Sequence, residues 1–285
     1  MKITDPVLVP DVSNWCDHIN PKEFEDGGCG SVVVGLYPTK INGKVVLHPT
    51  CRQQCVDVAT KSQMVLQCYF WDDIILDPIA QADWLVATLQ SEGLPVKFVW
   101  CDQEQWWTDW NAWYLYRRGQ FSSDYVPKAT PGNISLHYAN FARRLHDQFA
   151  QMGVYTNKGF VSSWTPPMDT WLPQYWAWVP QYERQPVQVT AMTWTQLKAN
   201  WLPNYDIVLS AGQLPAQVVG HQFTGDVCIL PGAYDAYGRP QVLDVSAFSQ
   251  DFISQLRAGN VPTPPPPAPT PTPTYHAYRN LKYNL

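Results

Sequence analysis

Short runs of apolar residues recur along the chain at lengths typical of buried β-strands. Several are almost continuously apolar instead of alternating, which is typical of strands covered on both faces of a parallel sheet. Eight runs predict strands, at residues 7–13, 31–37, 64–70, 96–102, 153–157, 175–179, 205–210 and 217–223.

Between some of these runs the apolar residues take a helical spacing. Residues 78–93 show it, with Gly93 as a stop signal, and residues 135–153 show it again, with an expected end at Gly153. Later connections are shorter and their helical patterns weaker. The order of elements predicts an α/β fold, a TIM-like β/α barrel with incomplete helices in its second half.

The composition divides the chain into three parts. Residues 1–258 are mixed and predict the barrel, residues 259–274 form a linker rich in proline and threonine, and residues 275–285 form a short aromatic and basic peptide. Proline fixes φ and removes a backbone donor, so the linker should be an extended spacer. A stiff spacer before rings and cations favours a docking peptide, and a solvated end without a partner is the alternative.

The charge balance argues against two classes of protein. The net charge is −5 and the basic residues form no long run, which does not fit a nucleic-acid binder. No apolar run approaches the length of a membrane span. The first residues also lack the basic region and long apolar stretch of a secretory signal.

Cysteine and histidine give little sign of chemistry. The seven cysteines are odd in number and scattered, which favours reduced, buried thiols. Cys51 and Cys55 lie near His48, but a metal site of the usual spacing needs a second cluster, so neither a metal nor another cofactor is expected. His137 and His146 are expected to be solvated or to cap a helix, and no G-x-S-x-G motif accompanies them.

Carboxylates follow several of the predicted strands. Asp11 follows VLVP, Asp102 and Glu104 follow VKFVWC, and Asp244 follows QVL. In a β/α barrel the chemistry lies where parallel strands end, so we expect these four groups to meet at one pole.

The D-x-E pair Asp102 and Glu104 is the sharpest of these features. Residues two apart on a strand point to the same side, with Cα atoms roughly 6.6 Å apart. Neighbouring carboxyl groups push their pKa values apart, so one stays protonated while the other is charged. Glycoside cleavage needs this division between an acid and an anion. The motif gains its force from its place after an apolar strand and before a tryptophan cluster.

Aromatic residues make up 14% of the chain, with 14 Trp. Two clusters stand out, at residues 106–116 and 170–182. Some of these rings must be core, because Trp and Tyr carry large apolar areas. Beside polar loops, stacking on sugar rings is the competing interpretation.

Several motifs in order resemble family 25 glycoside hydrolases, the Chalaropsis-type lysozymes that include many phage endolysins. They are DVSNW (11–15), WCDQE (100–104), GVYTNKGF (153–160), YWAWVPQY (175–182), HQFTGD (221–226) and LDVSAF (243–248). The resemblance implies an eight-stranded barrel and cleavage of the β-1,4 bond between N-acetylmuramic acid and N-acetylglucosamine. Bacterial peptidoglycan would be the partner. A phage virion or the host cytoplasm would hold the protein before release.

The resemblance also implies roles for residues. Glu104 would be the proton donor, and Asp102 would stabilise charge or orient the substrate's N-acetyl group. Three departures stand around the expected pole: VVVGLYPTK replaces the family's K-x-[ST]-E-G-like stretch, His221 replaces a Trp, and residues 105–133 form a long connection after the catalytic strand. The residues expected to contact substrate are Asp11, Asp244, Tyr69, Tyr155, Trp178, Tyr182 and Trp106.

Two other functions compete with the enzyme. A non-catalytic carbohydrate-binding barrel, in a phage virion or a similar particle, would use the rings but needs no proton donor. Retention of both Asp102 and Glu104 counts against it, and the altered second strand counts in its favour. A structural scaffold anchored through the C-terminal peptide is the third possibility.

Overall fold

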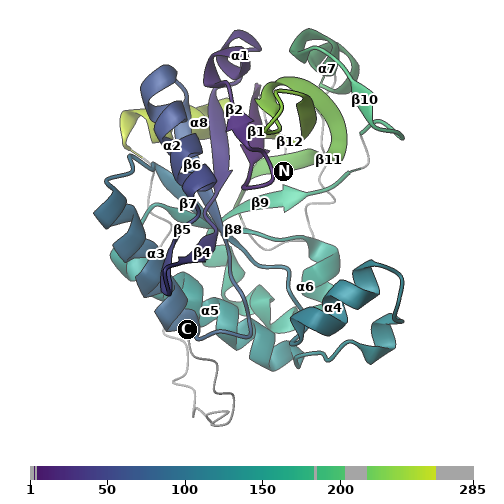
Figure 1. The fold of residues 1–285 in the computed structure, drawn as a ribbon. Coiled ribbons are helices and arrows are strands. Elements are labelled where there is room, and N and C mark those ends of the chain that lie inside the picture. The colour runs from purple at the N-terminus through teal and green to yellow at the C-terminus, as the bar shows by residue number, and fades with distance from the viewer. Residues whose placement is uncertain (1–2, 4, 183–184, 203–216, 261–285) are drawn as a thin grey trace.

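The computed structural model describes residues 3, 5–182, 185–202 and 217–260, and its centre is a closed β-barrel (Figure 1). The pairing of β11 with both β9 and β12 closes the sheet. The barrel strands, in their order around it, are β1 (Pro6–Val12), β3 (Ser31–Gly35), β6 (Val65–Trp71), β7 (Phe98–Asp102), β8 (Met152–Tyr155), β9 (Trp176–Pro180), β11 (Gln217–Tyr234) and β12 (Pro240–Ser249).

One barrel strand runs against the others. The strands from β1 round to β11 pair in parallel, whereas β12 is antiparallel to both of its neighbours, β11 and β1. Figure 1 shows the green β12 beside the purple β1, so the last strand meets the first. The smaller strands are β2 (His18–Ile19), β4 (Pro38–Ile41), β5 (Lys44–Leu47) and β10 (Thr190–Ala191).

The predicted strands and the barrel agree closely. Seven of the eight predicted runs overlap barrel strands, and the run at 205–210 lies outside the described residues. The remaining barrel strand is β12, which the apolar pattern did not indicate. Its sequence PQVLDVSAFS mixes polar and apolar residues, because only part of each face is buried.

Two hydrophobic cores follow from the alternation of side chains along the strands. On β7, Phe98 and Trp100 belong to a core inside the barrel, whereas Val99 and Cys101 belong to the core between strands and helices. Successive strand residues point to opposite faces, and here both faces are apolar. The nearly continuous apolar runs in the sequence therefore arise from strands buried on both sides.

Helices cover the outside of the barrel (Figure 1), and the last three described helices are short. They are α1 (Pro21–Asp26), α2 (Pro49–Lys61), α3 (Pro78–Glu92), α4 (Trp110–Arg117), α5 (Pro131–Gln148), α6 (Lys158–Trp164), α7 (Trp194–Trp201) and α8 (Gln250–Ala258). Between β8 and β9, α6 is followed by two short 3₁₀ helices, and a third lies between α4 and α5: η2 (Pro166–Thr170), η3 (Leu172–Gln174) and η1 (Ser123–Tyr125). The expected barrel with incomplete helices in its second half is confirmed.

Local signals explain where these helices begin and end, with one correction. Asp77 caps α3 by accepting from the N–H groups of Ile79 and Ala80, and Gly93 ends it in the left-handed conformation, φ 61°. The second predicted helix does not reach Gly153, because α5 ends at Gln148. Gly153 lies within β8, where the ring of Trp100 occupies the space of a side chain.

The last described helix, α8, ends at Ala258, so the linker from Val261 onward and the C-terminal peptide lie outside the described residues. All seven cysteines are described, buried and free of disulfides, as predicted. Within the described ranges, no helix has the length and apolar character needed to cross a membrane.

Candidate active site

Asp11 and Asp244 face each other across neighbouring strands, although most of the chain separates them. The register pairs Asp11 on β1 with Asp244 on β12. The sequence placed Asp244 at the end of a strand, but it lies within β12. Because β12 runs antiparallel, this position reaches the pole where β1 and the other parallel strands end.

Asp102 ends β7 at the same pole. It pairs with Trp71 on β6 and Tyr155 on β8, and alternation places it on the inward face with Phe98 and Trp100. Its side chain is only 6% exposed, and its Oδ1 atom is buried without a hydrogen-bond partner. A buried carboxyl oxygen of this kind is free to accept a hydrogen bond from a ligand.

Burial shifts the pKa values of Asp102 and Glu104 in the same direction. Burial raises the pKa of Asp102 well above its usual value, and the nearby charges of Glu104, Asp11 and Asp72 raise it further. Burial also raises the pKa of Glu104, to about 7. Glu104 therefore holds its proton to neutral pH, as a general acid must.

Gln222 connects the carboxylates to two tyrosines. Its Nε2 donates to Asp11 Oδ2 at 3.1 Å and to Asp244 Oδ2 at 3.0 Å. Its Oε1 accepts from the hydroxyls of Tyr155 at 2.5 Å and Tyr182 at 2.9 Å. Sequence reasoning did not name Gln222 as a site residue, although it lies in the HQF run. A glutamine has no distinctive signal until its partners are known.

Three of the predicted aromatic residues, Tyr69, Tyr155 and Trp178, differ in their contacts and burial. The hydroxyls of Tyr69 and Tyr37 lie 3.1 Å apart, and the Tyr155 ring lies 4.5 Å from that of Trp178, centroid to centroid. Trp178 is only 2% exposed, and its indole N–H donates to Ser246 at 2.9 Å. Direct sugar contact by Trp178 is therefore wrong, because its ring is part of the barrel core beneath the pole.

Tyr182 and Trp106 are more accessible but lie in different settings. Tyr182 is 42% exposed while its hydroxyl binds Gln222, so its ring is open beside the carboxylates. Trp106 is half-buried and stacks on Trp164, with centroids 4.5 Å apart and Lys128 over both rings. The described ring contacts join Trp106 to Trp107, to Trp113 on α4 and to Trp164 on α6, and not to the tyrosines of the pole.

At the end of β3, where the sequence departs from the family pattern, the ring of Tyr37 packs beside Gly35. A Cβ atom at Gly35 would lie 2.7 Å from Tyr37 Cε2 and 2.8 Å from Tyr69 Cζ, so the glycine allows these two rings to approach the strand end. The charges of Asp102 and Asp11 contribute to the raised pKa of Tyr37, after burial and despite its bond to Tyr69. Tyr37 therefore faces the same pole, and sequence reasoning had not named it.

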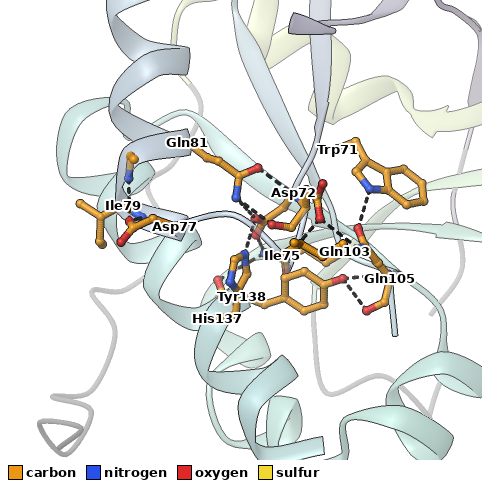
Figure 2. Close-up of polar contacts among 12 residues, drawn as sticks. Trp71, Asp72, Ile75, Asp77, Ile79, Gln81, Gln103, Gln105, His137 and Tyr138 are labelled. Atoms are coloured by element: carbon orange, nitrogen blue, oxygen red, sulfur yellow. Dashed lines mark hydrogen bonds and ion pairs between the residues drawn. The ribbon is translucent and has the colours of Figure 1, made fainter. Parts of the chain in front are cut away.

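Buried polar groups around Asp72, His137 and Tyr138 hold the end of β7 and the residues that follow it (Figure 2). Asp72 is fully buried and lies 2.8 Å from His137 Nε2, and its backbone N–H donates to the carbonyl of Asp102. Tyr138 holds both the N–H and the carbonyl of Gln105 with its hydroxyl, at 2.8 and 3.0 Å. The expectation of a solvated or capping His137 is wrong, because its side chain is 10% exposed and paired.

Another buried amide joins these polar groups. Gln103 donates to the Tyr138 carbonyl at 3.3 Å and approaches Asp72 Oδ2 at 3.5 Å. The peptide that carries Asp102 and Glu104 is thus fixed by Asp72, which directly follows β6, and by Tyr138 on α5. Over the described part of the chain, no group of three or more His, Cys, Asp or Glu side chains is arranged to hold a metal ion.

Solved structures share this fold. A family 25 glycosyl hydrolase from Bacillus anthracis superposes with a TM-score of 0.55 at 10% identity, covering 88% of this chain and 92% of that one. A bacterial lysozyme from Streptomyces coelicolor gives 0.56 at 12% identity, with 90% and 100% covered. The catalytic domain of endolysin ply40 from bacteriophage P40 of Listeria monocytogenes gives 0.53 at 16%, with 89% and 98% covered.

These likenesses are between folds, since the identities are low. No protein-family model matches the sequence, and no curated protein matches it either. The chain therefore has the distorted β/α barrel of family 25 glycosyl hydrolases, with carboxyl groups gathered at the C-terminal pole of the strands.

Proposed function

We propose that the protein is a peptidoglycan hydrolase, an N-acetylmuramidase of lysozyme type. It would cleave the β-1,4 bond between N-acetylmuramic acid and N-acetylglucosamine. The observation that carries the proposal is the pair at the end of β7: Glu104 with a pKa of about 7, beside Asp102 with an unpartnered buried oxygen. A buried carboxyl group with a raised pKa at this pole favours a general acid over a binding module.

The two groups have different roles in the reaction. Glu104 donates its proton to the glycosidic oxygen as the bond to the anomeric carbon breaks. As a carboxylate, Asp102 would stabilise the positive charge that develops on the sugar, and in the protonated form that its raised pKa favours it would orient the N-acetyl group. The free Oδ1 of Asp102 suits the second role, because an N-acetyl N–H would supply the missing partner.

The remaining residues hold the sugars. Asp11 and Asp244 would hold sugar hydroxyls, and the exposed ring of Tyr182 offers a flat face to a pyranose. Tyr69 and Tyr155 present phenols to the same space. Two relatives in fold are a lysozyme and an endolysin catalytic domain, which supports a wall glycan as the substrate.

Wall-suspension turbidity with matched variants tests this function. Glu104→Gln should keep the fold and glycan binding while hydrolysis falls by roughly 10²-fold or more, the usual size of general acid catalysis. The control is Glu92→Gln on α3, whose carboxylate binds Arg52 at the surface. An inactive wild-type protein that binds wall glycan would support the non-catalytic barrel instead.

We propose further that the protein acts on the bacterial wall from a phage particle or after synthesis in a host cell. The spacer at 259–274 would present the peptide at 275–285 to its carrier. Truncation after Gly259 should leave hydrolysis of soluble muropeptides unchanged and weaken sedimentation with virions or walls. Equal association of the truncated protein would make the peptide a solvated end.

A further inference from the structure

We propose that Asp11 is a neutral hydrogen-bond donor in this site and that Gln222 is the positioning residue that keeps Asp244 as its charged partner. The proton of the pair would lie on Asp11 Oδ1 and point toward a sugar oxygen. This inference deepens the proposed function, on which its sugar ligand rests. Its proton assignment can be tested without any substrate.

The orientation of the Gln222 amide is fixed by its four contacts. It is 3% exposed and uses both N–H donors and both lone pairs of its oxygen. A flipped amide would set its oxygen against two carboxyl oxygens, which repel it unless they are protonated. The tyrosines donate to Oε1, so Oδ2 of both Asp11 and Asp244 must accept.

Both oxygens of Asp244 accept a hydrogen bond. Its Oδ2 accepts from Gln222 at 3.0 Å, and its Oδ1 accepts from the backbone N–H of Asp226 at 2.6 Å. Bonds to both oxygens favour the carboxylate form. Asp226 takes a positive φ of 53°, a conformation that brings its N–H to this position at some backbone cost.

Asp11 differs from Asp244 in one respect. Its Oδ2 accepts from Gln222, whereas its Oδ1 has no described hydrogen bond. A carboxylic acid with Oδ2 as the carbonyl and Oδ1 as the hydroxyl satisfies Gln222 and leaves one donor free. The geometry therefore assigns the shared proton of this cross-strand pair to Asp11.

The surroundings favour retention of that proton. Burial and the charge of Asp244 raise the pKa of Asp11, and burial raises that of Asp244 to about 7. The titratable groups described around the pair are all acids, so none of these offers a compensating positive charge. They are Cys16, Tyr37, Tyr69, Asp102, Glu104, Tyr182, Asp226 and Cys228.

Carboxyl ¹³C NMR of the full chain, labelled at aspartate Cγ, tests the assignment directly. Signals are identified from Asp11→Asn and Asp244→Asn spectra. We expect Asp244 to ionise at the lower pH and Asp11 to remain neutral until a higher pH. Ionisation of Asp11 before Asp244 would overturn the proposal, whether or not the protein hydrolyses walls.

The same two variants separate donor from acceptor. Asp11→Asn keeps a carbonyl for Gln222 and an outward N–H donor, so its hydrolysis should fall less than that of Asp244→Asn. Asp244→Asn sets an N–H group against the N–H donors of Gln222 or Asp226, so hydrolysis and Tm should both fall, hydrolysis by at least about tenfold. A larger loss for Asp11→Asn than for Asp244→Asn would contradict the account.

Gln222→Met tests the positioning role, with Gln67→Met as control. Gln67 is a buried amide on β6 that bonds Ser31 and Trp100 and touches no carboxylate among the described contacts. Loss of the Gln222 donors should raise the NMR pKa of Asp244 by about one unit, and the control should not. An unchanged Asp244 titration in Gln222→Met would remove Gln222 from this role. A wild type without hydrolysis but with these titrations would refute only the proposed function.

Discussion

Gly153 on β8 lies directly against the ring of Trp100 on β7, inside the barrel. A Cβ atom at Gly153 would stand 2.5 Å from Trp100 Cζ3 and 2.9 Å from the carbonyl oxygen of Trp176. Trp100 cannot move easily, because its indole N–H donates to Gln67 and its ring packs on Phe98 and Phe248. Asp102 lies two residues after Trp100 on the same strand, so this contact fixes the core directly beneath the site.

Gly153→Ala should therefore destabilise the protein by about 1–3 kcal/mol, the usual cost of overpacking a core. Urea unfolding followed by tryptophan fluorescence measures the change. The control is Gly132→Ala near the start of α5, where an added Cβ meets nothing within 4 Å. Equal stability of the two variants would mean that the barrel interior has room that the structure does not show.

Asp102 should make the protein less stable as the pH rises. The pKa of Asp102 is raised in the folded state. Between about pH 4, the pKa in the unfolded chain, and this higher pKa, the folded protein therefore binds more protons than the unfolded chain. The free energy of unfolding then falls with increasing pH. Asp102→Asn removes this fall, so its Tm should exceed that of wild type at about pH 7.5 by at least ~2 °C.

Below about pH 4 the difference between Asp102→Asn and wild type should vanish, because both folded and unfolded Asp102 are then protonated. Asp83→Asn on α3 is a control of opposite sign, since the hydrogen bond from Arg144 lowers the pKa of Asp83. It should not stabilise the protein at neutral pH. Calorimetry that finds Asp102→Asn no more stable than wild type at neutral pH would contradict the burial of an ionisable group there.

The rate of hydrolysis should fall as the pH rises through about 7. Glu104 must carry its proton to act as the acid, and burial places its pKa at about 7. The profile of kcat/KM against pH on a soluble muropeptide reports this group in the free enzyme. The residual activity of Glu104→Gln should lack this limb. A limb near the ordinary glutamate pKa, about 4.3, would assign another group as the acid.

Most of the barrel strands could be predicted from the sequence, because strands that are buried on both faces consist mainly of apolar residues. An apolar run such as SVVVGLY at 31–37 is recognisable by composition alone. By contrast, β12 carries Asp244 and Ser246 on its inward side and so does not look like a buried strand. The end of α5 was misplaced because glycine is a common helix stop. The actual constraint at Gly153, the ring of Trp100, comes from residues far away in the sequence.

The candidate carboxylates were found because each follows or lies in a recognisable motif. Gln222 and Tyr37 were missed, since an amide and a phenol acquire a role only from the groups they contact. Trp178 was predicted to contact sugar because of its motif, but a motif does not indicate whether a side chain is buried. Pairings such as Asp72 with His137 join the segment after β6 to α5 and need the assembled fold.

The mass of the fragments released from a purified bacterial wall tests the central claim most directly. The wild-type protein should release muropeptides that end in a reducing N-acetylmuramic acid, and Glu104→Gln should release roughly 10²-fold fewer. Fragments that end in reducing N-acetylglucosamine would contradict muramidase specificity. Equal release by the Gln variant would contradict the role of Glu104, and no release by the folded wild-type protein would contradict the enzyme itself.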